Sequence, residues 1–314
     1  MTVVDAHAHV IVPGLGAEVT WQEGRQVVHA SGREVRSALR EFVDLPRILA
    51  EQDAAGVDVV VLCPWVNLLG RETGRQNEAL AAMAGERVAV LGTVDLSRPA
   101  ELAELMADGR LAGVEVAAAP DGDYLGHERF EEFWAAAEET GALVFVHPST
   151  HGLAQPVMDE YYLWNAVGNP VETAITAAHM TLAGVPERHP GLRVLLAHGG
   201  GALPALRGRL AHAHSFQPQA RARLAEPLLD SLGRFLYDTV VHDVDVLRGL
   251  VEFAGPENVL LGSDYPFDMG VERPAEIVRA LGLPAGQEAA ILGGNALRLL
   301  GREAPESVAT GGES

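Results

Sequence analysis

The chain has 314 residues and a formal net charge of −20, because 43 acidic residues outnumber 23 basic ones. Every basic residue is an arginine, which excludes chemistry that needs lysine: Schiff-base and pyridoxal-phosphate catalysis, a phosphate-binding loop ending in lysine, and a carbamylated lysine bridging two metals. The negative charge also argues against nucleic acid or an anionic membrane as a partner, since either requires clustered positive charge.

The cysteine content and the N-terminal residues bear on the compartment. Cys63 is the single cysteine, so no internal disulfide can form, and a reducing compartment is indicated. Residues 1–5 contain no basic segment of the kind that opens a signal peptide, and no apolar run approaches the roughly 18 residues of a membrane span. We therefore expect a cytoplasmic protein.

Eight short apolar runs alternate with amphipathic stretches that are rich in alanine and leucine. Eight strands separated by helices predict a (β/α)₈ TIM barrel, here a single unit over residues 1–301. The expected strands are 3–6, 57–63, 88–94, 112–117, 142–146, 192–197, 235–237 and 259–261. The helical stretches include 45–54, 77–84, 99–107, 128–140, 244–253 and 274–281.

Three segments depart from this repeat. Residues 13–42 contain short β-type runs punctuated by glycines, which predicts a small antiparallel insertion after the first strand. Residues 148–170 predict a long irregular loop that contains Tyr161, Tyr162 and Trp164, and loops of this length are usually functional or disordered. Residues 302–314 predict a flexible tail.

Four histidines and one aspartate follow strands of the predicted barrel. His7 and His9 come at the end of the first strand, His147 ends the fifth, His198 ends the sixth and Asp264 the eighth. The carboxyl ends of barrel strands meet at the mouth where barrel enzymes carry out their chemistry. Three imidazoles and one carboxylate form a ligand set that suits Zn²⁺ first, and Mn²⁺, Fe²⁺ or Co²⁺ after it. The pattern predicts a metal site.

This arrangement resembles the amidohydrolase superfamily and, within it, the aminocarboxymuconate semialdehyde decarboxylase family. The likeness runs roughly from residue 3 to residue 300, and its most characteristic segments are 167–173 (VGNPVET), 198–204 (HGGGALP), 241–243 (VHD) and 262–267 (GSDYPF). The family consists of metal-dependent decarboxylases without an organic cofactor. The resemblance implies that His7, His9, His147 and Asp264 bind one metal, and that His198 is the catalytic acid/base beside a metal-bound water, with Asp264 also in the catalytic centre.

Two arginines also have counterparts in the family. The resemblance implies that Arg36 binds the carboxylate of the substrate and that Arg209 reaches into the neighbouring site of a homodimer. From position alone, Arg36 fits a solvated hairpin charge equally well, and Arg209 fits a surface helix residue. His242 and Asp243 follow the seventh predicted strand at the mouth. Asp243 can serve as the cap of the following helix, and His242 can support the site from outside.

Glu115, in the fourth predicted strand, is the one residue there that could bridge a second metal. Its strand register favours a buried layer position instead, so we expect a single metal. After His147 the chain reads Pro148-Ser149-Thr150, where the family typically has tryptophan and aspartate, and Asn165 replaces a frequent aromatic residue. These differences leave the particular substrate open.

The predicted function is non-oxidative decarboxylation of an unsaturated or aromatic carboxylic acid. The main alternative is metal-dependent hydrolysis of an amide, ester or lactone, which would use the same acid/base but would not need arginines for a carboxylate. A second alternative is a metal-binding barrel without turnover that acts as a structural or regulatory partner.

Overall fold

A computed structural model describes residues 1–30, 33–149, 152–153 and 155–303. Its largest sheet has eight strands, all paired in parallel, in the order β1-β5-β6-β7-β8-β9-β10-β11. Ala6 N of the first strand donates at 2.8 Å to the carbonyl oxygen of Leu261, the residue after the last strand, so the two edges of the sheet meet in a nearly closed barrel. The strands are β1 Val4–Val10, β5 Val59–Pro64, β6 Val88–Gly92, β7 Gly113–Ala117, β8 Leu143–His147, β9 Arg193–Leu196, β10 Leu236–Asp238 and β11 Val259–Leu260.

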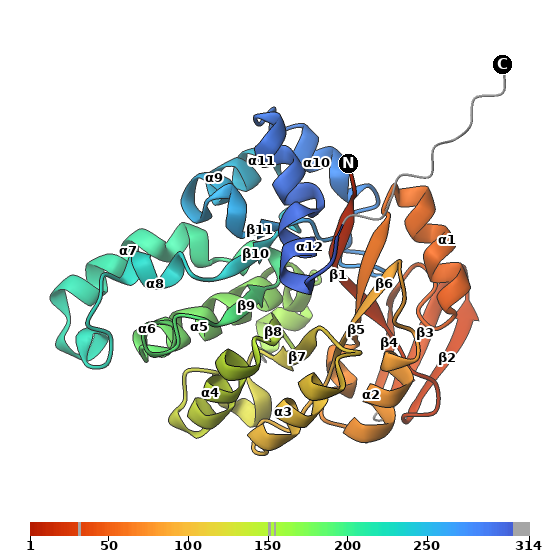
Figure 1. Ribbon diagram of the computed structural model, residues 1–314, viewed down its shortest axis with the longest axis horizontal. Helices are drawn as coiled ribbons and strands as arrows, with labels where there is room; N and C mark the ends of the chain where they lie inside the picture. Colours follow the sequence, from red (N-terminus) through yellow and green to blue (C-terminus); the bar gives the residue numbers. More distant parts are fainter. Residues whose placement is uncertain (31–32, 150–151, 154, 304–314) are drawn as a thin grey trace.

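Helices follow the strands and surround the barrel (Figure 1). Their ends follow local rules: α1 begins after Asp44, whose side chain accepts from Arg47 N, and it stops at Gly56 in the left-handed region. The α-helices are α1 Leu45–Ala55, α2 Thr73–Ala81, α3 Pro99–Asp108, α4 Glu131–Thr140, α5 Asn169–Leu182, α6 Val185–Arg188, α7 Leu203–Phe216, α8 Leu228–Leu232, α9 Val244–Ala254, α10 Pro274–Arg279, α11 Ala285–Ala289 and α12 Asn295–Leu300. The barrel fold is therefore confirmed.

The predicted insertion is a separate antiparallel sheet of β2 Ala17–Gln22, β3 Arg25–Ala30 and β4 Arg33–Ala38. It lies beside α1, at the opposite side of the view from α7 (Figure 1). Backbone bonds join it to the segment that follows β11: Leu39 N donates to Pro266 O at 3.0 Å, and Asp268 N donates to Ser37 O at 2.7 Å. The insertion is thus attached to one edge of the barrel mouth.

The first strand is longer than expected. We predicted that it ends at residue 6, but β1 continues to Val10, so His7 and His9 lie inside the strand rather than after it. The extension is held by β5, with His9 opposite Cys63 and Val10 opposite Pro64, and the register shifts between Asp5 and Ala8. All seven residues of β1 are buried, which places both imidazoles in the barrel interior.

The long segment after β8 contains more regular structure than predicted. It includes the 3₁₀ turn η4 Pro156–Asp159 and the π-helix η5 Trp164–Gly168, which leads directly into α5. Residues 150, 151 and 154 of this segment, and residues 304–314 of the predicted tail, lie outside the described residues. The single unit over 1–301 and the flexible tail therefore stay predictions. Within the described ranges, no helix combines the length and apolar character needed to cross a membrane.

Candidate metal centre

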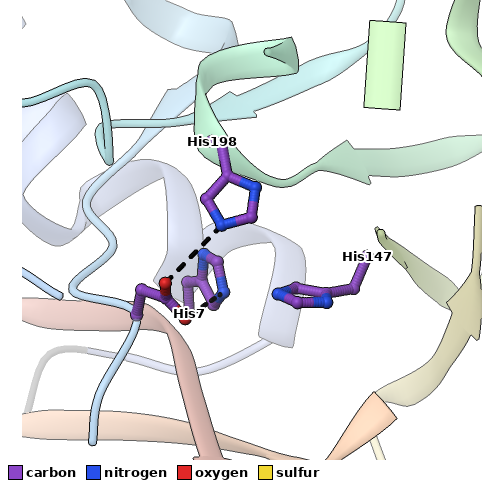
Figure 2. A group of neighbouring side chains, drawn as sticks. His7, His147 and His198 are labelled. Carbon is purple, nitrogen blue, oxygen red and sulfur yellow. Dashed lines mark ion pairs between the residues drawn. The ribbon is translucent and has the colours of Figure 1, made fainter. Parts of the chain in front are cut away.

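Side chains from four strands converge at the mouth of the barrel. One ligand atom from each of His7, His147, His198 and Asp264 lies within 4.8 Å of the others, and Figure 2 shows the three rings directed toward a common space. His9 belongs to the same cluster, because its Nε2 lies 3.1 Å from His7 Nε2 and 3.5 Å from Asp264 Oδ1. The structure brings together all five residues that the sequence singled out.

Asp238, at the end of β10, orients this cluster and was not singled out from the sequence. Its fully buried carboxylate accepts a hydrogen bond of 2.6 Å from His7 Nδ1 and also accepts the backbone N–H groups of His198 and Gly199 at 2.9 and 2.7 Å. A carboxylate on the far nitrogen of a ligating histidine fixes its tautomer and ring orientation. The available signal was position, because Asp238 ends the seventh strand at the same mouth.

Outer hydrogen bonds orient two of the rings so that their Nε2 atoms face the centre. His7 donates from Nδ1 to Asp238, and His147 Nδ1 lies 2.8 Å from the carbonyl oxygen of Pro148, so the Nε2 atom of each ring faces the centre. Among the described residues, His147 Nε2 and Asp264 Oδ1 are buried without a hydrogen-bond partner. Buried acceptors without donors are unfavourable unless a cation satisfies them. The residues therefore fit a divalent metal.

The electrostatics of the cluster also favour positive charge at its centre. Burial lowers the pKa of His7, but the carboxylates of Asp264 and Asp238 outweigh burial and raise that pKa to about 10. Burial and the neighbouring histidines hold the pKa of His147 well below its usual value, so this ring stays neutral and able to ligate. Burial raises the pKa of Asp264, yet the surrounding imidazoles hold it well below its usual range. Asp264 and His147 are thus in the forms that bind a metal, whereas a metal would displace the second proton that the raised pKa keeps on His7.

His198 differs from the other histidines of the cluster. Its side chain is 13% exposed, whereas His7 and His9 are fully buried, and its Nε2 lies 3.6 Å from Asp264 Oδ2. Its Nδ1, like that of His9, has no hydrogen-bond partner among the described residues. His198 is therefore the imidazole of the cluster that is accessible from the mouth.

The glycines after His198 allow its backbone to turn sharply at the strand end. His198 itself has a φ of 56°, and Gly201 has a φ of 61°. A Cβ atom at Gly201 would lie 1.9 Å from the carbonyl oxygen of Pro170, at the start of α5. A larger residue there would push α5 away from the turn, which explains physically why this stretch is glycine.

Glu115 occupies the layer below His9, as the strand register predicted. Its side chain is buried, Oε2 lies 3.8 Å from His9 Nδ1, and neither oxygen has a hydrogen-bond partner in the described part of the chain. Burial raises the pKa of Glu115 well above its usual value, which favours the neutral acid. Glu115 is not in the group of converging ligand atoms, and the cluster supports a single metal site.

A cavity of about 1230 Å³ has Arg36 and Asp268 among the residues that line it. None of the five cluster residues is among its described lining residues, but Asp268 is close enough to Asp264 for their charges to interact. Arg36 is half-exposed; its Nε donates to Glu34 at 2.5 Å, and one terminal nitrogen donates to Gln22 at 3.2 Å. Arg209 is exposed on α7, across the view from the insertion, and is not among the described residues of the cavity wall (Figure 1). The two arginines therefore do not meet within one chain.

Two acidic residues outside the cluster have structural roles. Asp243 caps α9 by accepting from the backbone N–H groups of Asp245 and Val246, which confirms the capping alternative, and His242 is exposed. Glu172, buried on α5, accepts the backbone N–H of Ser149 at 2.6 Å and secures the segment after His147. Burial raises the pKa of Glu172 to about 7. Sequence reasoning gave Glu172 no role, although it belongs to the VGNPVET segment.

Comparison with known proteins gives a consistent result. The sequence profile of the amidohydrolase family matches residues 4–302. A 2-amino-3-carboxymuconate-6-semialdehyde decarboxylase of Dictyostelium discoideum is 33% identical over 204 residues, which is 64% of this chain and 56% of the relative. A 6-methylsalicylic acid decarboxylase of Penicillium expansum is 32% identical over 145 residues, 46% of this chain and 44% of the relative. The chain thus matches only about half the length of these relatives.

Solved structures share the fold over almost the whole chain. The 5-carboxyvanillate decarboxylase of Sphingomonas paucimobilis superposes with a TM-score of 0.80 at 22% identity, covering 96% of this chain and 99% of the other. The 5-carboxyvanillate decarboxylase of Novosphingobium aromaticivorans, complexed with manganese and 4-hydroxy-3-methoxy-5-nitrobenzoic acid, has a TM-score of 0.79 at 20% identity and covers 96% of each chain.

Proposed function

We propose that this chain, which belongs to the amidohydrolase family, is a metal-dependent decarboxylase that removes CO₂ from an aromatic or unsaturated carboxylic acid without oxidation. The observation that carries the proposal is the His/Asp cluster at the barrel mouth, and a cavity lined by arginine in the same chain supports it. The two relatives described above are named as decarboxylases, which supports the lyase over the hydrolase alternative.

His7, His9, His147 and Asp264 would hold the metal. His9 completes this set rather than His198 because it is fully buried, whereas His198 is accessible from the mouth. A bound divalent cation would polarise an oxygen of the substrate or of water and stabilise negative charge that develops during the reaction. The nitrogen-rich donor set suits Zn²⁺, and manganese is present in the Novosphingobium structure, so both metals belong in the test.

His198 would move the proton that decarboxylation requires. In our proposal its Nε2 delivers a proton to the carbon that bears the carboxylate, the bond between that carbon and the carboxylate breaks, and CO₂ leaves. The protonated carbon then recovers the unsaturation of the substrate. Imidazole suits this task because it both gives and takes protons near neutral pH.

Two arginines would orient the leaving carboxylate, because a planar guanidinium binds a carboxylate through two parallel hydrogen bonds. Arg36 lines the cavity of its own chain. Arg209 is exposed on α7, which lies across the view from the insertion, so in our proposal it serves the neighbouring site of a homodimer. The buried free thiol of Cys63 is consistent with the cytoplasm, and fractionation of producing cells tests that location.

Removal of the metal is expected to abolish CO₂ release, because the cluster then lacks the charge that stabilises the reacting oxygen. We expect one metal per chain by elemental analysis, and activity of the chelated protein on a panel that includes 6-methylsalicylate to return with Zn²⁺ or Mn²⁺. CO₂ and the decarboxylated product should appear in equal amounts. Full activity after verified metal removal, or hydrolysis of an ester or lactone without CO₂ release from any acid, would contradict the proposal.

Mixing two inactive variants is expected to restore activity if Arg209 serves the partner's site. Arg209→Ala dimers lack the arginine at both sites, and His198→Asn dimers lack the acid/base at both. In a mixed dimer, one site combines an intact His198 with an intact Arg209 from the other subunit. CO₂ release should therefore rise on mixing in proportion to the mixed dimer measured by native mass spectrometry. Mixed dimers without a gain, or a monomer in sedimentation, would exclude this role.

A further inference from the structure

The outer wall of the cavity brings together residues from three distant segments. Arg25 and Ser37 come from the insertion, Tyr162 from the segment before α5, and Asp268 from the segment after β11. Asp268 directly follows Phe267, whose ring centroid is 5.4 Å from that of His9. Phe267 thus links the wall to the metal cluster, and the charge of Asp264 acts on both Asp268 and Tyr162.

Tyr162 and Asp268 form a pair on this wall. The hydroxyl of Tyr162 donates to Asp268 Oδ1 at 3.0 Å, and both side chains are half-buried. Asp268 is held from the other side, because its backbone N–H donates to Ser37 O at 2.7 Å. The ring of Tyr162 packs edge-on against Trp164, with centroids 5.0 Å apart. Contacts from separate segments thus hold the pair in place.

The backbone around Tyr162 is constrained for this placement. Tyr161 and Tyr162 have φ values of 53° and 64°, two consecutive residues in the left-handed region. Tyrosine rarely adopts this conformation, which persists only where surrounding contacts impose it. As a result the two neighbouring side chains have different environments: Tyr161 is 88% exposed, whereas Tyr162 lines the cavity.

The pair retains capacity to accept hydrogen bonds. A carboxylate has about four acceptor positions. The carboxylate of Asp268 uses two of them, for the hydroxyl of Tyr162 and for the backbone N–H of Met269. The tyrosine hydroxyl also keeps acceptor lone pairs. Burial raises the pKa of Asp268, while the hydrogen bond from Tyr162 and the positive charge of Arg25 oppose that rise. A ligand group that donates a hydrogen bond would match this wall, whereas a methyl group would leave its acceptors unsatisfied.

We propose that Tyr162 and Asp268 form a specificity subsite that recognises a hydroxyl or amino donor on the substrate acid, on a part of the molecule other than the carboxylate being lost. This inference rests on the proposed decarboxylase function and deepens it. Sites that hydrogen-bond a hydroxyl discriminate strongly against analogues that lack it. Because the wall is only half-buried, we expect a preference of about tenfold or more rather than the largest known values.

Matched acids test the subsite. 2,6-Dihydroxybenzoate and 6-methylsalicylate differ only in a hydroxyl or a methyl group at one ring position, and analogous 2-hydroxybenzoate pairs place that difference at each other position. With metal-loaded protein, we would measure Kd from tryptophan fluorescence, since Trp65 and Trp164 line the cavity, and kcat/KM from CO₂ release. At one ring position the hydroxyl member should bind about tenfold or more tightly. Ratios near one at every position would overturn the proposal.

Variants of Tyr162 and Asp268 test whether these two residues cause the preference for the hydroxyl member. Asp268→Leu should bring the ratio at that position close to one, Tyr162→Phe should lower it, and Asp268→Asn, which keeps an acceptor oxygen, should retain part of it. Arg36→Gln is the matched control on the same wall, and it should weaken both acids equally and leave their ratio unchanged. A ratio unaffected by Asp268→Leu and Asp268→Asn, with melting temperatures that show folded proteins, would overturn the proposal.

The two readouts separate this inference from the proposed function. A binding preference that depends on Asp268, without CO₂ release from any acid, would support the subsite and contradict the decarboxylase. CO₂ release with equal kcat/KM for both members of every pair would support the decarboxylase and contradict the subsite.

Discussion

Replacement of His198 by asparagine is expected to lower kcat for CO₂ release by roughly 100- to 10,000-fold, the usual contribution of a positioned general acid/base. The physical reason is that His198 is the accessible imidazole of the cluster, with its Nε2 3.6 Å from Asp264 and its Nδ1 without a partner among the described residues. Asparagine is the appropriate substitution because it tolerates the left-handed backbone that His198 adopts. The measurement is steady-state decarboxylation together with elemental analysis.

His242→Asn is the matched control for this variant. His242 also follows a strand at the mouth and has a φ of 58°, but its side chain is exposed. The control should retain activity and metal. The metal content of His198→Asn should equal that of the unchanged protein. If His198→Asn instead loses metal, His198 is a ligand, and the assignment of the acid/base must be abandoned.

Replacement of Asp238 by alanine is expected to weaken metal binding by about 10- to 100-fold, the usual effect of losing an outer partner of a ligating histidine. Without the 2.6 Å hydrogen bond from His7 Nδ1, nothing holds the His7 ring in the tautomer that directs Nε2 to the metal. The backbone N–H groups of His198 and Gly199 would lose their acceptor as well. Competition with a chromogenic chelator measures the metal affinity, and thermal unfolding measures the stability.

Asp243→Ala is the control, because it also removes an aspartate that accepts backbone N–H groups after β10. It should cost about 1 kcal/mol of stability as a lost helix cap, without a change in metal affinity. If Asp238→Ala fails to fold, Asp238→Asn preserves most of the shape and still alters the bond to His7. Unchanged metal affinity in folded Asp238→Asn and Asp238→Ala would show that His7 does not depend on Asp238.

The barrel fold could be predicted from the sequence because each strand–helix unit of the barrel repeats the same local sequence pattern. Apolar runs of strand length and amphipathic helical stretches follow one another along the chain, and the glycine-punctuated residues 13–42 interrupt them only once. Residues that follow strands then gather at one mouth by the geometry of the barrel. This rule was sufficient to place His147, His198 and Asp264 together before any contact was known.

Other features depended on contacts that no local pattern contains. The length of β1 was underestimated because its extension is held by pairing with β5, more than fifty residues later. The ion pair of Arg36 with Glu34 became visible only once β4 had formed, because the two side chains must lie on the same face of that strand. The cavity wall combines the insertion, the segment before α5 and the segment after β11, so its selectivity could not be inferred from any one of them.

Residue types and their spacing were enough to specify a barrel with histidines and an aspartate at its mouth, and the absence of lysine excluded a carbamylated bridge between two metals. Tertiary structure decided which atoms of those side chains face the centre of the cluster and which imidazole is accessible from the mouth. The physical reason is that an imidazole tautomer is set by its outer hydrogen bond, and the partner of His7 in that bond, Asp238, lies 231 positions away in the chain.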